Sequence, residues 1–150
     1  MKLLDVDFPG HFCAVPWSDP VVEAVGFGFD HAYVELLWLP VVGPSSTWIF
    51  RRLGARVSQH PDGVDIDLAE LSNSMGLGDV VGSTSTVQRS LRRLLRFGLA
   101  SWQGRLAVRT AVPPLAARNL DRLPGELRLI HQSLVGGRCG GLVAQRPDPT

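Results

Sequence analysis

The stretch TVQRSLRRLLRF, residues 86–97, decides the fold of this chain, and Gly98 follows it. At about 100° per residue, one side of a helix over this stretch is aliphatic and the opposite side, within an arc of roughly 100°, is basic. The aliphatic members are Val87, Leu91, Leu94 and Leu95, and the basic members are Arg89, Arg92, Arg93 and Arg96. Gly98 suits the left-handed position that ends a helix. The stretch therefore predicts an amphipathic helix with an arginine face.

A β-hairpin is expected directly after this helix. Residues 99–102 and 105–110 read as two strands, and Gln103-Gly104 between them suits a tight turn. Arg105 and Arg109 are four residues apart and so share one face of the second strand. Pro113-Pro114 ends the hairpin.

Two further helices and a short strand are expected before the arginine-rich stretch. A helix of about 14 residues starts near Ser45, with apolar residues at helical spacing, and stops at His60-Pro61-Asp62-Gly63. Its apolar stripe, Trp48, Ile49, Leu53 and Val57, is expected in the core. Val64–Asp67 alternates as a short strand, and Asp67 with Glu70 predicts the capped start of a second helix. That helix buries Leu68, Leu71 and Met75.

This order of elements resembles a winged helix-turn-helix domain of the bacterial or phage transcription-regulator type. The resemblance covers roughly Ser45 to Val112 and rests on three local matches: DLAEL from Asp67, MGLG from Met75 and LLRFGLA from Leu94. The turn Gly76–Thr84 is longer than the usual three or four residues. Either the arginine-rich helix begins earlier, near Gly82-Ser83, or the loop is expanded.

The resemblance implies a sequence-specific, double-stranded DNA-binding transcription regulator. In that family the second helix of the motif lies in the major groove, and the hairpin touches the DNA backbone or minor groove. Groove-facing roles then go to Ser85, Thr86, Gln88, Arg89, Arg92 and Arg93. Gln88 suits adenine and Arg89 suits guanine. Phosphate contacts go to Arg96, Arg105 and Arg109.

The charge distribution also favours an anionic partner. The net charge is +1, yet residues 1–50 carry −5 and residues 51–150 carry +6, and Val80–Leu120 holds seven arginines and no acid. Two other readings stay open. Arg supplies 14 of the 15 basic residues, so the face is simply solvated if this bias is compositional. Alternatively, the domain is a protein-protein adaptor of the transcription or replication machinery, and its arginine face binds an acidic protein or the chain's own acidic N-terminal region.

No enzyme, metal or membrane signal stands out, and we expect no cofactor. The histidines are scattered without a nucleophile or second ligand at suitable spacing. His11, Cys13 and Cys139 lack a fourth zinc ligand. The longest uncharged run, Leu36–Phe50, has 15 residues with two prolines, against about 20 for a bilayer span. Two cysteines and an acidic start favour a reduced, cytoplasmic setting.

The expected architecture is mainly α with a small β-hairpin, an α+β fold in four parts. Residues 1–43 form an irregular arm with short helices near Val21–Val25 and Asp30–Trp38, the latter ended by Leu39-Pro40. Residues 44–113 form the winged domain, 114–135 a helical extension and 136–150 a flexible tail. A homodimer is expected through the C-terminal helix, with its apolar face of Leu127, Ile130 and Leu134, or through the N-terminal segment.

Overall fold

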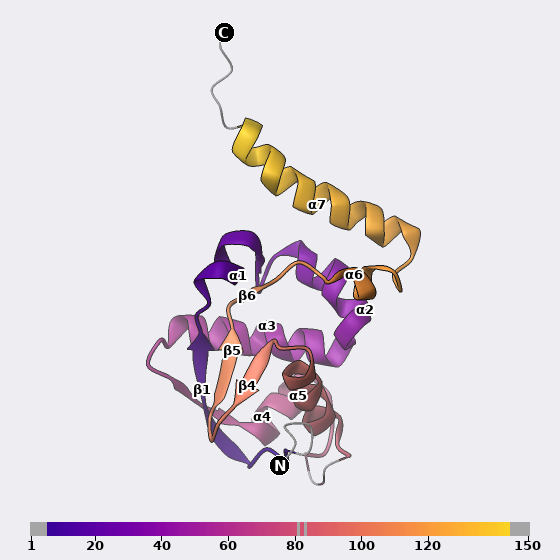
Figure 1. The fold of residues 1–150 in the computed structure, drawn as a ribbon. Coiled ribbons are helices and arrows are strands. Elements are labelled where there is room, and N and C mark those ends of the chain that lie inside the picture. The colour runs from indigo at the N-terminus through magenta and orange to yellow at the C-terminus, as the bar shows by residue number, and fades with distance from the viewer. Residues whose placement is uncertain (1–5, 81, 83, 145–150) are drawn as a thin grey trace.

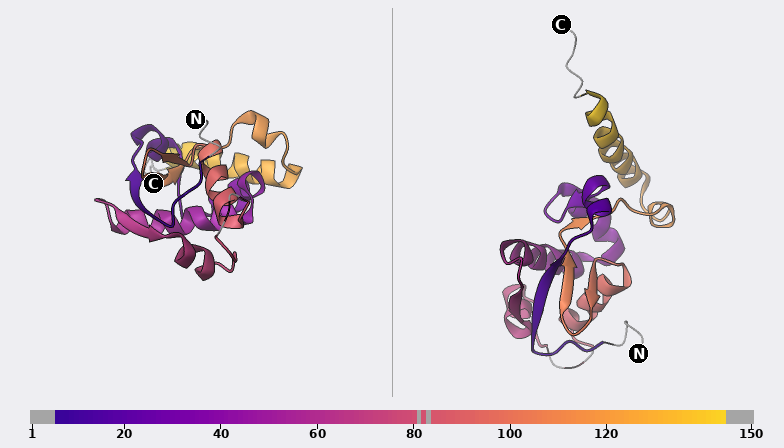
Figure 2. Two further views of the ribbon diagram at one scale, coloured as in Figure 1. Left: turned by 90° about the horizontal axis from the view of Figure 1, so that it is seen from below. Right: turned by 60° about the vertical axis from the view of Figure 1, so that its left-hand side comes forward.

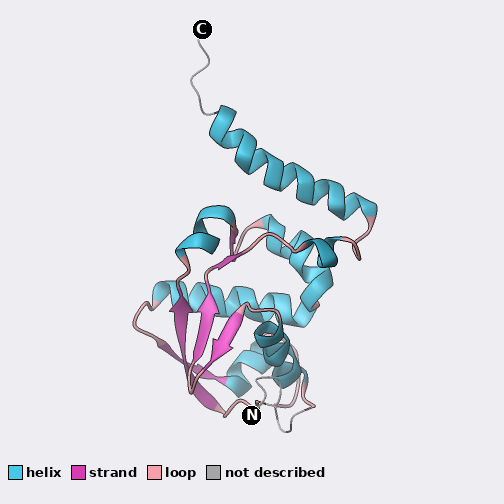
Figure 3. Cartoon of the chain, in the orientation of Figure 1, coloured by secondary structure: helices cyan, strands magenta, loops and turns pink. Residues whose placement is uncertain are grey.

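The computed structural model of the chain describes residues 6–80, 82 and 84–144, and it has an α+β fold. The strands are β1 (His11–Trp17), β2 (Phe27–Gly28), β3 (Val64–Asp67), β4 (Ala100–Trp102), β5 (Leu106–Arg109) and β6 (Ala111–Val112). The α-helices are α1 (Pro20–Val25), α2 (Leu39–Val42), α3 (Pro44–Gln59), α4 (Leu68–Ser74), α5 (Thr86–Arg96), α6 (Ala117–Leu120) and α7 (Gly125–Ala144), and a π-helix, η2, spans Val34–Trp38. The larger sheet has the order β3-β1-β5-β4, and β2 pairs with β6 (Figures 1 and 3).

The core lies between the larger sheet and helices α3 and α5. Figure 1 shows α3 lying across one face of the sheet, with α5 beside it. The helices contribute Ile49, Phe50, Leu53, Val57, Val87, Leu91 and Leu94, and the sheet contributes Ile66, Leu106 and Val108, all fully buried. Burial of each of the larger aliphatic side chains contributes about 1.5–3 kcal/mol. No helix among the described residues has the length and apolar character needed to cross a bilayer.

Strand β1 corrects the expectation that residues 1–43 form an irregular arm. It pairs antiparallel with β3 and parallel with β5, so it is an inner strand of the sheet. Phe12 and Ala14 point into the core while His11 and Cys13 are exposed. This alternation of exposed and buried residues covers only His11–Ala14 and lies close to Pro16, so the sequence by itself does not predict a strand here. Pairing with residues more than 45 positions away along the chain stabilises it.

The helix expected to end at Leu39-Pro40 instead continues to Val42. Its first part is the π-helix η2, in which the Leu39 N–H donates to the Val34 carbonyl. Pro40 then lies in the first turn of α2, where a residue needs no N–H partner within the helix. The change from π to α hydrogen bonding therefore accommodates the proline.

The elements expected between residues 44 and 113 are present with small shifts. Asp67 caps α4 by accepting hydrogen bonds from the N–H groups of Ala69 and Glu70, at 3.0 and 3.2 Å. Strands β4 and β5 pair as the predicted hairpin. Because α5 begins at Thr86, the loop after α4 is expanded, which decides between the two alternatives for that turn.

Trp48 is not in the core as expected, because its side chain is 51% exposed. The buried face of α3 is centred on Ile49, Phe50, Leu53 and Val57. Trp48 lies at the edge of this face, and the Arg51 guanidinium lies 5.6 Å from its ring centroid. Trp102, by contrast, packs edge-on against Phe8 and Phe12.

The C-terminal part consists of α6 and the long helix α7, which extends away from the sheet (Figure 2). We expected this helix to end at residue 135, but it continues to Ala144. The prediction gave too much weight to the glycines at 136, 137, 140 and 141. Each glycine lowers helix stability by about 1 kcal/mol relative to alanine, but extending an existing helix adds one hydrogen bond per residue. The rest of the expected tail, 145–150, lies outside the described residues.

Candidate functional site

Helix α5 presents its arginine face to solvent because its other side is fixed in the core. Val87, Leu91 and Leu94 are fully buried, whereas three of the four arginines, Arg89, Arg93 and Arg96, are exposed. Hydroxyl contacts with α3 set the rotation of the helix: Ser90 Oγ lies 2.7 Å from Ser45 Oγ, and Ser46 Oγ donates to the Ser90 carbonyl at 3.0 Å. The predicted division into two faces is thus confirmed for these residues.

Gln88 does not lie on the exposed face, which corrects its expected role at a base edge. Its side chain is 4% exposed. The amide nitrogen donates to the Phe8 carbonyl, and the amide oxygen accepts from the Phe8 N–H, both at 2.8 Å. Both polar atoms are occupied, so Gln88 holds the N-terminal segment against α5.

Arg92 is also turned toward the N-terminal segment. One of its guanidinium nitrogens lies 3.2 Å from the Asp7 carboxylate and donates to the Val6 carbonyl at 3.1 Å. The Arg92 side chain is 16% exposed. This arginine is therefore much less accessible than the three exposed ones, contrary to its expected groove-facing role.

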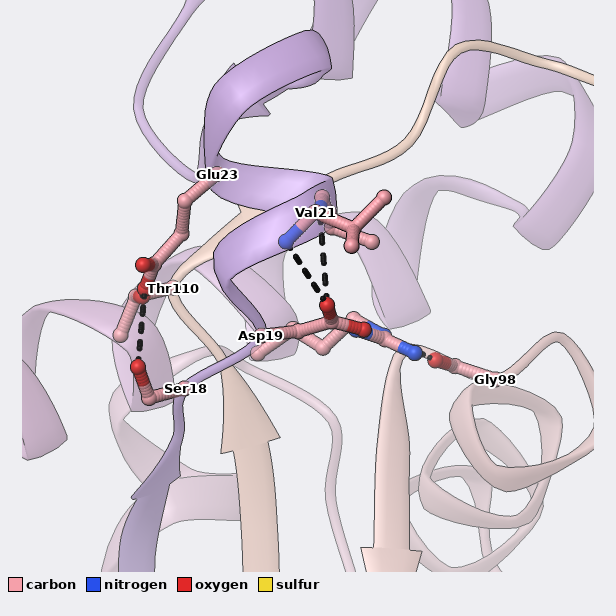
Figure 4. Close-up of polar contacts among 8 residues, drawn as sticks. Ser18, Asp19, Val21, Glu23, Gly98 and Thr110 are labelled. Carbon is pink, nitrogen blue, oxygen red and sulfur yellow. Dashed lines mark hydrogen bonds and ion pairs between the residues drawn. The ribbon is translucent and has the colours of Figure 1, made fainter.

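Arg109 is a structural residue rather than the exposed phosphate contact that we expected. Its guanidinium donates to the Gly98 carbonyl at 2.7 Å and to the Asp19 carboxylate at 3.0 Å. It also lies 3.8 Å from the centroid of the Trp17 ring. Figure 4 shows Asp19 at the start of α1, where its carboxylate also accepts from the Val21 N–H. Arg109 thereby ties α1 to the end of α5.

The contact with Arg109 has an electrostatic consequence for Asp19. The Arg109 hydrogen bond, followed by that from the Val22 N–H, holds the pKa of the Asp19 carboxyl below its ordinary value. Both groups stabilise the ionised carboxylate. Asp19 thus remains charged to lower pH than an ordinary aspartate.

Two small hollows adjoin on the arginine face. One, of about 190 Å³, is lined by Arg89, Arg92, Arg93 and Arg96. The other, of about 220 Å³, lies where α5 meets the start of α3 and is lined by Ser45, Ser46, Thr86, Arg89, Ser90 and Arg93. Arg89 and Arg93 line both hollows, so two guanidinium groups border a continuous concave surface of hydroxyls and positive charge.

The remaining predicted site residues lie at the margins of this surface. Thr86 lines the second hollow, and Ser85 is the residue before α5, its hydroxyl 3.5 Å from the Val80 carbonyl. Arg105 is exposed in the turn of the β4–β5 hairpin. Sequence reasoning missed Ser45 and Ser46, because only the packing of α3 on α5 brings their hydroxyls beside Arg89 and Arg93.

Metal-ligating side chains do not gather in the part of the chain that the structure describes. Among residues 6–80, 82 and 84–144, no three His, Cys, Asp or Glu side chains lie together as metal ligands would. Tyr33 and His131 form a partly buried polar pair between the core and α7, with Tyr33 Oη 2.7 Å from His131 Nδ1. Burial raises the pKa of the Tyr33 hydroxyl and lowers the pKa of His131.

Comparisons of the chain with protein-family models, curated proteins and solved structures gave no match. The functional argument therefore depends on the chemistry of the arginine face.

Proposed function

We propose that this chain is a winged helix-turn-helix protein that binds double-stranded DNA and regulates transcription. The observation that carries the proposal is the exposed row Arg89, Arg93 and Arg96 on α5. This row is preceded by the capped helix α4 and followed by the β4–β5 hairpin, the order on which the resemblance rests. A helix with this composition gains affinity for a polyanion by releasing counterions from phosphates.

The proposed contacts are fewer than the sequence alone implied. Arg89, Arg93 and Arg96 face the duplex from α5, and Arg105 reaches it from the hairpin turn. Ser85 and Thr86 lie at the N-terminal end of α5, where a recognition helix comes nearest to base edges. Gln88, Arg92 and Arg109 are excluded from direct roles because contacts within the chain occupy them.

Strand β1 is an addition to the element order of the resemblance. It lies between β3 and β5, so the strand before α4 does not pair with the hairpin. In the proposed function, the segment before β1 holds α5 in position, because Phe8 exchanges two hydrogen bonds with the buried Gln88.

A homodimer through α7 is part of the proposal. The N-terminal segment, the other expected dimer surface, is used within the chain, since Tyr33, Leu37 and Trp38 are buried. On α7, Leu129 is 66% exposed, whereas Leu127, Ile130 and Leu134 are partly buried against the core.

Binding to a labelled duplex of about 30 base pairs, followed by fluorescence anisotropy across salt concentrations, tests DNA binding. Four phosphate contacts give a slope of about −3.6 in log affinity against log salt, and so a loss of roughly 10²-fold between 50 and 200 mM. Six contacts would give a loss of about 10³-fold. Absence of binding at the lowest salt concentration would overturn the proposal, and preference for selected sites over random duplex would support regulation.

A second candidate, an adaptor that binds protein, is favoured by a different surface. Exposed Trp48 borders a hollow of about 560 Å³ with Met75 and Leu77, and Arg52 lies at its edge. Exposed tryptophan beside methionine is typical of protein interfaces. If the chain is an adaptor, it binds DNA weakly and without sequence preference, or does not bind DNA. If it is a DNA regulator, the W48A variant keeps the duplex affinity of wild type, because Trp48 lies outside the arginine face.

A further inference from the structure

We infer that the hollow between α5 and the first turn of α3 holds one phosphate group of the DNA backbone. This inference rests on the proposed function and deepens it, because it assigns a particular contact to residues that sequence reasoning did not place in the site. Its lining combines two guanidinium groups, Arg89 and Arg93, with the hydroxyl-bearing residues Ser45, Ser46, Thr86 and Ser90.

Arg93 is held in position for such a contact. Its Nη1 donates to the Val42 carbonyl at 3.2 Å and lies close enough to Gly43 that a Cβ there would approach it to 3.0 Å. Gly43 has a φ of 91° and precedes α3 directly. The guanidinium is thus fixed beside the helix start while its side chain stays exposed, which reduces the entropy lost when it binds a ligand.

The first turn of α3 has backbone donors available to an anion. Its first position is Pro44, and within the described residues the hydrogen bonds of the helix start with the Thr47 N–H, which donates to the Gly43 carbonyl at 3.0 Å. No side chain caps this end. The N–H groups of Ser45 and Ser46 therefore have no acceptor within the helix, and both residues line the hollow.

The local charge is uncompensated by any acid on the two helices at this point. The first turn of α3 holds no acidic residue, and α5 holds none along its length. The N-terminal end of a helix carries a partial positive charge, so two guanidinium groups beside it repel it. A bound anion converts this repulsion into attraction.

A phosphodiester matches the donors in number. It offers two unesterified oxygens, one for the N–H groups of Ser45 and Ser46 and one for the fork of Arg93. The hollow of about 220 Å³ exceeds the roughly 30 Å³ occupied by one water several-fold, so a phosphate group fits. In this arrangement Arg89 and Arg93 anchor the backbone, and Arg89 is not free to read guanine.

The test uses the full chain and inorganic phosphate, with amide NMR as the readout. In a phosphate-free buffer, phosphate is titrated against chloride at equal ionic strength. The expected result is a shift of the Ser45 and Ser46 amide signals that saturates with phosphate concentration. The apparent affinity for phosphate taken from this titration is expected to be at least tenfold weaker in R93Q and in R89Q. The control R118Q removes an exposed arginine on α6 and leaves the shifts unchanged. The amide spectrum also reports whether each variant is folded.

Two results of the NMR titration overturn the inference: Ser45 and Ser46 amides that do not respond to phosphate beyond chloride, or responses equal in R93Q, R89Q and wild type. The experiments distinguish failure of the inference from failure of the proposed function. If phosphate moves these amides but no duplex binds, the hollow is an anion site, and both the DNA proposal and the assignment of the anion to the DNA backbone are wrong.

Duplex binding gives the complementary arm. Single phosphates along the duplex are replaced in turn by neutral methylphosphonates. At one position, the replacement is expected to lower the duplex affinity of wild type and of R118Q, but not to lower the affinity of R93Q further. If the duplex binds with a steep salt slope and no position shows this coupling, DNA binding stands and the backbone contact is wrong.

Discussion

Arg109 is enclosed by the Trp17 ring, the Gly98 carbonyl and the Asp19 carboxylate, and this arrangement makes Asp19 sensitive to acid. The pKa of Asp19 is lower in the folded chain than its ordinary value of about 3.9. A lowered folded pKa means that the unfolded chain binds the proton more readily. The contribution of Asp19 to stability is therefore present above about pH 4 and is lost as the pH falls through the lower folded value.

We expect D19N to be less stable than wild type at pH 7, and the difference to shrink as the pH falls below about 4. Urea unfolding at a series of pH values measures both effects. The control is D62N, in the exposed turn after α3. An equal difference between wild type and D19N at pH 7 and at pH 2.5 would contradict the role given to the ion pair.

Gln88 and Arg96 separate folding from binding at the residue scale. Q88A leaves the buried Phe8 N–H and carbonyl without partners, and each unsatisfied group costs about 1–3 kcal/mol. R96Q changes an exposed residue, so its free energy of unfolding stays within about 0.5 kcal/mol of wild type. We expect R96Q to reduce the DNA salt slope by about 1. Urea unfolding checks the stability of both variants, and anisotropy checks the salt slope of R96Q. A Q88A variant as stable as wild type would contradict the role given to Gln88.

The sequence predicted the two faces of α5 because each residue of a helix has a fixed angular position. It did not predict which arginines are free, because their partners are distant along the chain. Gln88 meets Phe8 and Arg109 meets Asp19 across 80 and 90 residues. The resemblance placed Gln88 at a base edge and Arg109 at a phosphate, and a local pattern carries no information about contacts so distant along the chain.

At the scale of secondary-structure elements, the end of α1 at Gly26 lies directly against the backbone of β6. A Cβ at this position would collide with the Val112 carbonyl oxygen and the Val22 carbonyl oxygen, both main-chain atoms. These atoms move only if α1 or β6 moves. The glycine is required here for space, since its φ of −93° is open to other residues.

We expect G26A to lower the free energy of unfolding by about 1–3 kcal/mol, the usual cost of forcing extra atoms into a packed site. G10A is the matched control, because a Cβ at Gly10 meets nothing within 4 Å. Thermal or urea unfolding compares the two variants. Equal stability of G26A and G10A would show that the contact of α1 with β6 yields easily.

At the scale of the whole molecule, Tyr33 and His131 connect α7 to the rest of the chain. The Tyr33 hydroxyl oxygen accepts from the Leu115 N–H at 2.9 Å, and its proton is available to His131 Nδ1. This arrangement requires a neutral imidazole. Burial lowers the pKa of His131 below its ordinary value of about 6.5, so protonation is less favourable in the folded chain.

The attachment of α7 is therefore expected to weaken as the pH falls below about 6.5 and to be complete above it, because the unfolded or detached form binds the proton more readily. Hydrogen exchange of the α7 amides, corrected for the intrinsic effect of pH, measures this. We expect faster exchange at pH 5 than at pH 7.5 in wild type, and little pH dependence in H131Q. Identical corrected rates at both pH values would contradict the prediction.

The larger sheet joins distant parts of the sequence, which explains why the sequence predicted β3, β4 and β5 but not the inner strand β1. The hairpin β4–β5 is local and was predicted from its turn. Strand β1 depends on β3 and β5, about 50 and 90 positions away, and its short alternation between His11 and Ala14 carried too little information alone.

The inner position of β1 sets the order in which the chain is able to fold during synthesis. β1 leaves the ribosome before the other strands, yet its parallel partner β5 ends at Arg109, so the sheet stays incomplete until about 90 residues after β1 have been made. Only the pairing of β1 with β3 is available earlier. Such non-local pairing slows folding. The nascent chain consequently passes through a stage in which one edge of β1 is unpaired, and the arrival of β5 ends that exposure.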